Sequence, residues 1–299
     1  MTDFKHAGFI GMGVMGEPIC RNLASKAGLP VLGYDSNPAP LQRLAAHGVA
    51  AAASVAEVAQ RCDIVFLSLP SGEVVADVAR GPQGLLAHAR QGQVIVDTST
   101  SPIDTTRALA DEFAARGAIF IDAPVARTRA AAEAGTLSVM VGGDAEVFAR
   151  VRPLIAAFAS EITHCGPVGS GQVVKILNNM VLFETVTALS EARAIARRAG
   201  VDPKLLLETF TCGSADSFAL RNHGLKAMLP GNFPEKAFSV EYARKDLRYA
   251  LALAAQTGVD ASGARNVDRW FATAIDQGQG DRYFPVISRS IDADSAEPD

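Results

Sequence analysis

The sequence predicts an α/β domain with a doubly wound, mostly parallel sheet, followed by an all-α domain. Short apolar strands alternate with helices through the first half of the 299 residues, as in repeated β-α-β units. Strand signals stop near residue 166, and stretches of helical periodicity follow. We expect domains at residues 1–166 and 167–291, a long interdomain helix at about 170–199, and a flexible tail at 292–299.

The first strand, at residues 7–11, leads directly into a glycine-rich turn. Glycines at 11, 13 and 16 have the G-x-G-x-x-G spacing, and a helix with Pro18 in its first turn follows. The first glycine allows a tight turn, the second lets backbone approach a pyrophosphate, and the third lets helix and strand pack closely. The pattern predicts a Rossmann dinucleotide-binding loop made of Gly11, Met12, Gly13, Val14, Met15 and Gly16.

A carboxylate follows the second strand. Residues 30–34 form that strand, and Asp35 ends it about twenty residues after the glycines. A carboxylate there accepts hydrogen bonds from the adenine ribose hydroxyls and repels a 2′-phosphate. The sequence therefore favours NAD over NADP as cofactor.

Later strands carry further candidate cofactor residues at their carboxyl ends, where doubly wound sheets hold ligands. Leu69 and Pro70 close the strand at 63–69, and Thr98–Thr100 follow the strand at 93–97. These hydroxyls could reach the nicotinamide ribose or carboxamide, or cap the helix beginning near Pro102, and both uses can coexist. We select Leu69, Pro70 and Thr100 as cofactor contacts. The remaining expected elements are helices at 39–47, 54–60 and 144–157, strands at 118–122, 137–142 and 161–164, and a loop at 123–129.

The helix after Gly169 carries the candidate catalytic group. Lys175 lies near its start, and Asn178 and Asn179 follow at spacings of three and four residues, which places the three side chains on one face. A lysine beside two carboxamides is typical of a catalytic group with positioning partners. Helices at 203–210, 216–228, 240–256 and 261–276 complete the second half.

Composition narrows the class of protein. Hydrophobic residues make up 48% of the chain, and the net charge of -4 argues against a general nucleic-acid binder. Gly, Pro, Asp or Arg interrupts each apolar run, so no membrane span is expected. The four cysteines lack paired or metal-ligand spacing, which fits free thiols in a cytoplasmic protein without a metal site.

Several motifs together resemble the 3-hydroxyisobutyrate dehydrogenase family of β-hydroxyacid dehydrogenases. The matching stretches, in the family's order, are Gly8–Gly16, Asp97–Thr100, Asp122–Val125, Gly135–Gly143, Gly169–Asn179 and Lys245–Leu247. The resemblance implies a Rossmann domain, a long interdomain helix, and a helical domain that assembles a homodimer or homotetramer. It also implies that Lys175 is the catalytic lysine, Asn179 its assisting asparagine, and Lys245 a contact near the nicotinamide.

One departure from the family pattern concerns the substrate. After Asp-Ala-Pro-Val the family usually continues Ser-Gly-Gly, whereas this chain has Ala126-Arg127-Thr128. That loop looks like the Gly-Arg-Thr loop of the sulfolactaldehyde reductases of sulfoglycolysis, with Ala126 in place of the glycine. A guanidinium and a hydroxyl supply directed donors to a three-oxygen anion. Arg127 and Thr128 are thus expected to bind a sulfonate, with Asn178 and Asn179 also contacting substrate.

The expected reaction is NAD(H)-dependent reduction of 3-sulfolactaldehyde to 2,3-dihydroxypropane-1-sulfonate, with Lys175 protonating the developing alkoxide. Three alternatives stay open. The substrate could be a carboxylate, as for 3-hydroxyisobutyrate dehydrogenase or tartronate semialdehyde reductase, or a phosphorylated compound, since Arg binds all these anions. The chain could be a non-catalytic binding protein on a dehydrogenase fold. Arg127 and Lys245 could also be ordinary solvated charges.

Overall fold

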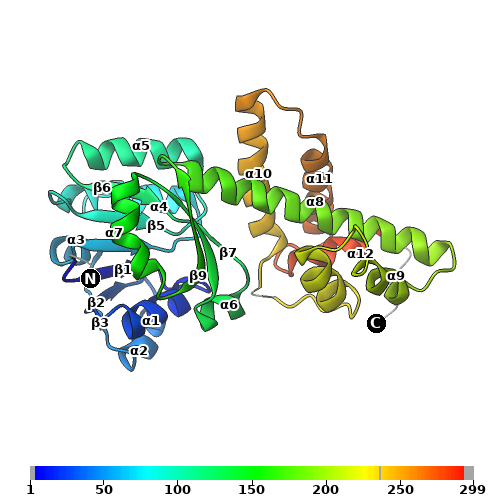
Figure 1. The fold of residues 1–299 in the computed structure, drawn as a ribbon, viewed down its shortest axis with the longest axis horizontal. Coiled ribbons are helices and arrows are strands. Elements are labelled where there is room, and N and C mark those ends of the chain that lie inside the picture. Colours follow the sequence, from blue (N-terminus) through cyan, green and yellow to red (C-terminus); the bar gives the residue numbers. More distant parts are fainter. Residues whose placement is uncertain (1–3, 236, 293–299) are drawn as a thin grey trace. The chain divides into compact units, whose positions relative to one another are not determined.

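The computed structural model describes residues 4–235 and 237–292. The chain forms two compact units, residues 1–175 and 176–299. The long helix α8 (Ser170–Arg198) contributes its first residues to the first unit and the rest to the second (Figure 1). Each unit has a hydrophobic core of its own.

The first unit is built on one mixed sheet. Its order across the described residues is β3-β2-β1-β4-β5-β6-β8-β7, with β9 beside β8. Neighbours from β3 to β6 are parallel, whereas β8 runs antiparallel to both β6 and β7. The strands are β1 (Ala7–Ile10), β2 (Val31–Tyr34), β3 (Val49–Ala51), β4 (Ile64–Leu67), β5 (Val94–Asp97), β6 (Ile119–Asp122), β7 (Val125–Ala126), β8 (Leu137–Gly142) and β9 (Ala159–Gly166).

Helices cover both faces of this sheet, as a doubly wound fold requires (Figure 1). Side chains of α1, α2 and α7 pack on one face, and those of α3, α4 and α5 pack on the other. The helices of this unit are α1 (Gly16–Lys26), α2 (Pro38–Ala45), α3 (Val55–Arg61), α4 (Gly72–Arg80), the 3-10 turn η1 (Leu86–His88), α5 (Ile103–Ala114), α6 (Arg129–Ala134) and α7 (Ala145–Ile155).

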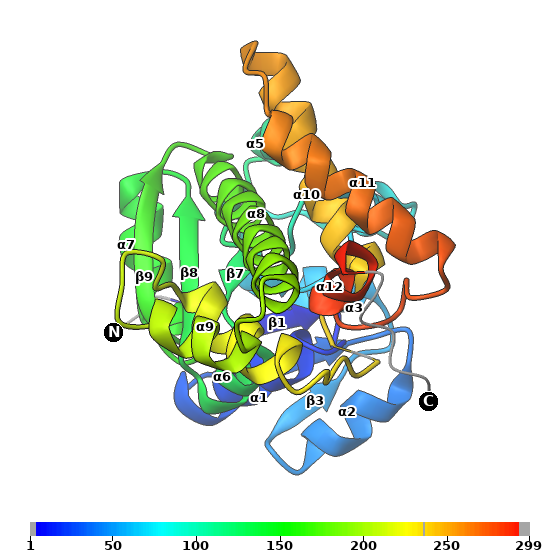
Figure 2. The same cartoon turned by 90° about the vertical axis from the view of Figure 1, so that its right-hand side faces the viewer.

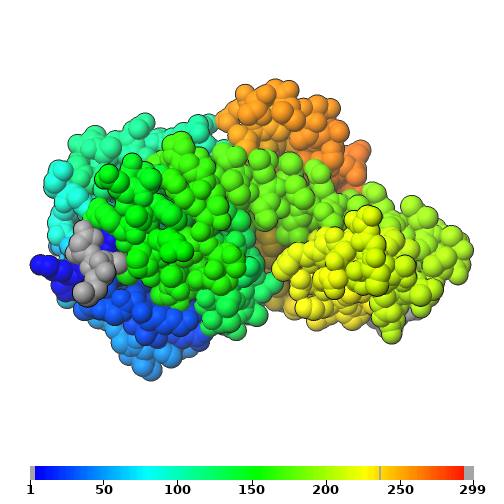
Figure 3. Space-filling model, viewed as in Figure 1, coloured from blue at the N-terminus to red at the C-terminus, as the bar shows by residue number. Residues whose placement is uncertain are grey.

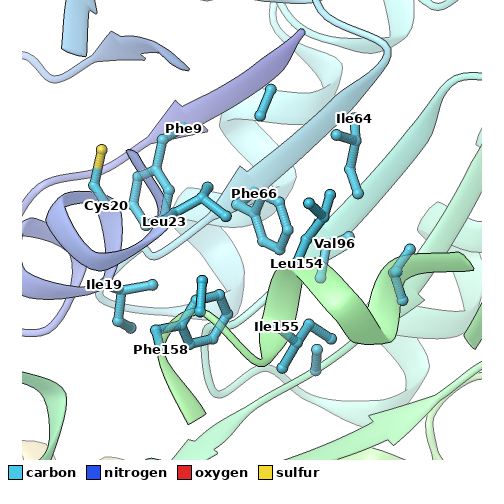
Figure 4. Packing of buried hydrophobic residues seen from close by; sticks show 14 of the residues in the cluster. Phe9, Ile19, Cys20, Leu23, Ile64, Phe66, Val96, Leu154, Ile155 and Phe158 are labelled. Atoms are coloured by element: carbon cyan, nitrogen blue, oxygen red, sulfur yellow. The ribbon is translucent and has the colours of Figure 1, made fainter. Parts of the chain in front are cut away.

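The parallel strands are apolar on both faces because each face is covered by helices. On β4, Phe66 packs with Phe9 and Phe158 on one face, at ring-centroid distances of 6.3 and 6.0 Å (Figure 4). Its neighbours Val65 and Leu67 belong to the cluster on the opposite face. The continuous apolar run at 64–67 is thus explained by two-sided burial.

The named elements of the second unit are all helices, and two isolated β-bridges, Glu235–Arg282 and Ser239–Tyr283, join its loops in the described residues. Phe183 of α8 contacts Phe271 and Phe284 at ring-centroid distances of 5.4 and 5.1 Å, and these rings form the centre of its core. Helices α10 and α11 pack side by side within this unit (Figure 2). Its other elements and their bounds are α9 (Pro203–Phe210), the π-helix η2 (Leu220–Met228), α10 (Val240–Thr257), α11 (Ser262–Asp276), the 3-10 turn η3 (Phe284–Val286) and α12 (Ile287–Ile291).

By length and composition alone, α8 could cross a membrane, which contradicts the expectation that no segment is long and apolar enough. The helix has 29 residues, and its most apolar stretch has a mean hydropathy of 1.3. Of that stretch, 44% is buried inside the protein. Phe183, Val186 and Leu189 lie in the core of the second unit, so the apolar character of α8 is used in packing.

Further features differ from the sequence-based expectation. The short strand β3 was missed, and the loop predicted at 123–129 contains β7 and the first residue of α6. The helix expected from 216 is instead a wider π-helix beginning at Leu220, in which Leu229 N–H bonds to the Gly224 carbonyl. The tail expected to be flexible from 292 is wrong at Asp292, which is buried and bonded by Arg197 and Arg198. Residues 293–299 of that tail lie outside the described residues.

Candidate active site

The candidate cofactor residues of the first unit follow the carboxyl ends of neighbouring parallel strands. Gly11 follows β1, Asp35 follows β2, Leu69 and Pro70 follow β4, and Thr100 follows β5. Because these strands are parallel, their carboxyl ends share one edge of the sheet. The strand order reverses between β1 and β4, and ligands of open α/β sheets bind at such a switch point.

The geometry of the glycine loop fits a dinucleotide. Gly11 has φ +90°, and a Cβ there or on Gly16 would collide with a backbone carbonyl oxygen. At Gly13, by contrast, nothing lies within 4 Å of a Cβ position, so open space faces the loop. Gly16 begins α1, whose N-terminus favours an anion. Met12 is buried, Met15 is the N-cap of α1, and Val14 is 49% exposed.

Asp35 is anchored next to this loop. Its Oδ2 accepts a hydrogen bond from the Met12 N–H, and its Oδ1 accepts one from the Asn37 N–H at 2.8 Å. A pocket of about 620 Å³ opens beside it, with Ser36, Leu41 and other residues in its wall. Each carboxylate oxygen has a second lone pair for a ribose hydroxyl, so the residues present fit NAD.

The turn after β5 is held by a dense set of hydrogen bonds. Asp97 accepts from the Ser99 N–H and the Ser101 hydroxyl at 2.9 and 3.0 Å. The Ser99 hydroxyl accepts from the Leu69 N–H at 2.9 Å, which ties this turn to the one after β4. None of these hydroxyls caps α5, whose N-cap is Pro102 without a side-chain bond. The helix-cap interpretation is therefore wrong, and Thr100 is held in a buried turn at the sheet's carboxyl edge.

Two buried carboxylates organise this edge. Burial raises the pKa of Asp97 to about 6, against the lowering effect of its bonds from Ser99 and Ser101. Burial likewise raises the pKa of Asp122 to about 6, although backbone N–H groups lower it. Asp122 accepts from the N–H groups of Gly169 and Gln172 at 2.7 and 2.8 Å, so it holds the start of α8.

The start of α8 brings the candidate catalytic lysine to the same edge. A Cβ on Gly171 would collide with the Met140 carbonyl oxygen, so the helix can approach β8 closely only with glycine there. Lys175 follows in the second turn of the helix and is 8% exposed. Asn178 and Asn179 lie on the next turn of the same continuous helix.

Asn179 is oriented by a residue that the sequence interpretation passed over. Its Nδ2 donates to Asp246 Oδ2 of α10 at 2.8 Å, and its Oδ1 accepts from Asn178 Nδ2 at 3.2 Å. Lys245 Nζ lies 3.2 Å from the other Asp246 oxygen and 3.9 Å from the centroid of the Tyr242 ring. Asp246 is 1% exposed, so the Lys245-Asp246 pair is not a solvated surface pair. Asp246 lies in the Lys245–Leu247 motif, so the sequence did contain a signal for its role.

Arg127 has an unusual backbone conformation. Its φ of 86° is the one positive value among the described non-glycine residues, at the position where the family usually has glycine. The side chain is exposed, and its Nη1 donates to the Thr136 carbonyl at 2.6 Å and to the Ser160 hydroxyl at 3.0 Å. The exposed Thr128 caps α6 by accepting from the Ala131 N–H at 3.4 Å. Both residues directly follow β7, the short strand that pairs with β8.

The first unit thus gathers most of the predicted residues on one sheet edge, and the second unit orders the asparagines. The glycine loop, Asp35, the turns after β4 and β5, and Lys175 all belong to the first unit. Asn178, Asn179 and Lys245 belong to the second unit, where Asp246 links Asn179 to Lys245. Sequence interpretation missed Asp122 and Gln172 as anchors, although both stand in motifs it singled out.

Comparison with known proteins agrees with this arrangement. Residues 6–166 match the NAD binding domain of 6-phosphogluconate dehydrogenase, and residues 169–289 match the NAD-binding domain of NADP-dependent 3-hydroxyisobutyrate dehydrogenase. The 3-hydroxyisobutyrate dehydrogenase of Pseudomonas aeruginosa is 37% identical over 260 residues, which cover 84% of this chain and 85% of that protein. The 2-(hydroxymethyl)glutarate dehydrogenase of Eubacterium barkeri is 36% identical over 244 residues, 82% of this chain and 80% of that protein.

Solved structures agree as well. The 3-hydroxyisobutyrate dehydrogenase of Mycobacterium tuberculosis, described with L-serine, has a TM-score of 0.88 at 32% identity, with 96% of this chain and 99% of that chain covered. Fold and site together define a Rossmann oxidoreductase that uses a nicotinamide dinucleotide. The chain belongs to the 3-hydroxyisobutyrate dehydrogenase family of β-hydroxyacid dehydrogenases.

Proposed function

We propose that this dehydrogenase reduces 3-sulfolactaldehyde to 2,3-dihydroxypropane-1-sulfonate with NADH. One hydride is added to the aldehyde carbon and one proton to its oxygen, so the aldehyde becomes a primary alcohol. Bound NADH supplies the hydride. The chain's own residues bind the anionic tail, orient the carbonyl and deliver the proton.

Lys175 has the proton role in this proposal. As ammonium it donates a hydrogen bond to the carbonyl oxygen, stabilises the developing alkoxide, and transfers the proton to it. In the reverse direction the neutral amine accepts that proton. The low exposure of Lys175, 8%, supports this role because charge–dipole interactions strengthen where water is excluded. Asp122 holds the first turn of α8 in place, and this limits the movement of Lys175.

Asn179 positions the substrate or the lysine. Because its Nδ2 donates to Asp246, the carboxamide orientation is set, and Oδ1 is the atom presented on the opposite side. An oxygen there can accept a hydrogen bond from an ammonium or a substrate hydroxyl. Lys245, on α10, is proposed to contact the nicotinamide end of the cofactor, as the family resemblance implies.

NAD is the preferred cofactor in this proposal. The Asp35 carboxylate accepts a hydrogen bond from the Met12 N–H of the glycine loop, which holds it next to the expected position of the adenine ribose. A 2′-phosphate there would place a second anion against this carboxylate, which is unfavourable in a partly buried site. Ser36 follows directly and supplies no positive charge to offset that repulsion.

The observation that carries the sulfonate assignment is the anchored Arg127 guanidinium. Both N–H groups of Nη1 are used by Thr136 and Ser160, which fix the plane of the group. Nε and Nη2 keep three N–H donors for a ligand, and the Thr128 hydroxyl can donate as well. Four donors in a fixed arrangement suit a sulfonate, which has three equivalent acceptor oxygens.

A second candidate substrate is a carboxylate, either the β-hydroxy acid 3-hydroxyisobutyrate or the aldehyde acid tartronate semialdehyde. The relatives favour it: the names 3-hydroxyisobutyrate and 2-(hydroxymethyl)glutarate both describe a hydroxymethyl group next to a carbon bearing carboxylate. L-Serine in the Mycobacterium tuberculosis structure has the same hydroxymethyl arrangement. The Nη1 bonds of Arg127 also show that part of its guanidinium serves the protein itself.

One screen separates these substrates. NADH oxidation is followed for short aldehydes that carry a sulfonate, a carboxylate, a phosphate or no charge, with wild type, Arg127→Gly and Arg129→Ala. Arg129 is the matched control because it lies two residues after Arg127, at the start of α6, but pairs with Glu133. A lost charge-assisted contact of about 1.5–3 kcal/mol lowers kcat/KM for the sulfonate roughly 10- to 100-fold in Arg127→Gly alone. Higher kcat/KM for a carboxylate, or equal losses on charged and uncharged aldehydes, would reject the sulfonate.

A homodimer or homotetramer in the cytoplasm completes the proposal. On α8, Leu177, Val181 and Ile195 are 37%, 57% and 67% exposed and share one helical face with Ala188. Part of the α8 surface is open in the space-filling view (Figure 3). An apolar stripe of this kind is typical of a subunit contact. Sedimentation of wild type and Val181→Glu tests it: a dimer or tetramer that dissociates in the variant is expected, and a monomeric wild type would refute it.

A further inference from the structure

The amide side chain of Gln172 lies between the two parts of the candidate active site in the first unit. Gln172 is fully buried at the start of α8. Its Nε2 donates to the Ser99 carbonyl at 2.9 Å, and its Oε1 accepts from the Ser101 N–H at 3.1 Å. Those two backbone groups belong to the peptide units before and after Thr100. One side chain thus fixes both backbone dihedral angles of Thr100.

The same residue is tied to the lysine helix. Its own backbone N–H donates to Asp122 Oδ2 at 2.8 Å, and Lys175 follows three residues later on the same helical face. A displacement of the Thr100 turn relative to α8 would break both amide bonds of Gln172. The side chain therefore sets the separation between the turn predicted to face the nicotinamide and the amine predicted to face the carbonyl oxygen.

We propose that Gln172 is a positioning residue for hydride transfer, acting through Thr100 and Lys175 without contacting the substrate. The inference rests on the proposed role of Lys175, and it holds for either a sulfonate or a carboxylate substrate. Hydride transfer requires reacting atoms about 3–3.5 Å apart, and a misplacement of about 1 Å lowers the rate by roughly 100-fold. Loss of the Gln172 amide should therefore lower kcat more than it weakens cofactor binding, which depends mainly on the glycine loop and Asp35.

The chain offers a matched control for this residue. Gln93 is also buried, at 3%, and its Nε2 donates to the carbonyls of Ala59 and Cys62 at 2.7 and 2.8 Å. It precedes β5, whereas the turn held by Gln172 follows β5, so the two amides serve opposite ends of one strand. Replacement of either glutamine by Met keeps the side-chain length and removes its hydrogen bonds. Only the Gln172 change is expected to affect catalysis beyond its effect on stability.

The experiment compares Gln172→Met, Gln93→Met and Lys175→Ala with wild type in the full-length enzyme. We measure Tm, NADH affinity by fluorescence, kcat, and the isotope effect with 4-deuterated NADH, using the aldehyde that wild type reduces fastest. We expect similar losses of Tm in the two Met variants. Gln172→Met alone should lose kcat roughly 100-fold and show a larger isotope effect. Its NADH affinity should stay within a few-fold of wild type. Equal kcat per folded molecule in the two Met variants would overturn the proposal.

If Gln172→Met does not fold, Gln172→Asn replaces it: this side chain keeps both polar groups but is one methylene shorter, and the same kcat loss with an intact NADH affinity is expected. Normal kcat in Gln172→Asn overturns the proposal. Full activity in Lys175→Ala refutes the role of the lysine, whereas an inactive Lys175→Ala with unaffected glutamine variants refutes the positioning role alone.

Discussion

Acidification should destabilise the second unit through one buried histidine. Burial lowers the pKa of His223 from its ordinary value of 6.5 to about 4, because the ring lies among Phe284 and Tyr283 in the core. Its Nδ1 shares a hydrogen bond of 2.6 Å with the Tyr283 hydroxyl, and Nε2 has no partner among the described residues. In the protonated ring both nitrogens carry a hydrogen, so a positive charge and an Nε2–H without an acceptor among the described residues would lie in the core.

The sign and size of the change in unfolding free energy with pH follow from these two pKa values. Between pH 6.5 and 4 the unfolded chain binds more protons at His223 than the folded chain does, so the stability present above pH 6.5 is lost as the pH falls toward 4. The difference corresponds to about 3 kcal/mol of unfolding free energy. Urea unfolding followed by the fluorescence of Trp270, the single tryptophan, which packs against this core, measures the loss. In His223→Phe this part of the pH dependence should vanish; parallel pH profiles for variant and wild type would refute the reasoning.

Three further results are expected. Asp35→Ala should raise the ratio of kcat/KM for NADPH to that for NADH at least about tenfold, because a repulsion of about 1.4 kcal/mol between the carboxylate and the 2′-phosphate is removed. An unchanged ratio would count against the ribose contact. Asp246→Asn should lower kcat by about tenfold, since the Asn179 carboxamide loses the carboxylate that sets its orientation; steady-state kinetics with unaltered kcat would contradict this. Arg127→Gly should leave the unfolding free energy in urea within about 1 kcal/mol of wild type, because relief of roughly 1–2 kcal/mol of left-handed strain offsets two lost hydrogen bonds. A loss above about 3 kcal/mol would mean that the guanidinium is mainly a structural anchor.

Local chemistry explains what the sequence predicted well. The glycines at 11, 13 and 16 indicate the backbone conformation and the close packing of the turn, which are set by residues near in sequence. The buried strands are recognised as continuous apolar runs. By contrast β3, with residues Val49–Ala51, is a short edge strand with two exposed alanines, so it carries no alternating or buried pattern.

Contacts between residues far apart in the chain explain the features that the sequence did not predict. Asn179 and Asp246 are 67 residues apart, and Arg197 and Asp292 are 95 apart. No local pattern indicates such pairs, so Asp292 was predicted as tail and Asp246 was given no role. The family motifs located Lys175 and Arg127, but the left-handed backbone of Arg127 and its bonds to Thr136 and Ser160 needed the fold.

The most direct measurement is single-turnover reduction of a short anionic aldehyde by wild type and Lys175→Ala, each preloaded with NADH at concentrations that saturate both. The variant is expected to bind NADH with near-normal affinity, because the glycine loop and Asp35 are intact. Its hydride-transfer rate is expected to fall by a factor of about 100 to 10,000, the usual contribution of a general acid. A variant that oxidises NADH at the wild-type rate would show that the proton comes from elsewhere, and the catalytic assignment of the α8 lysine would be wrong.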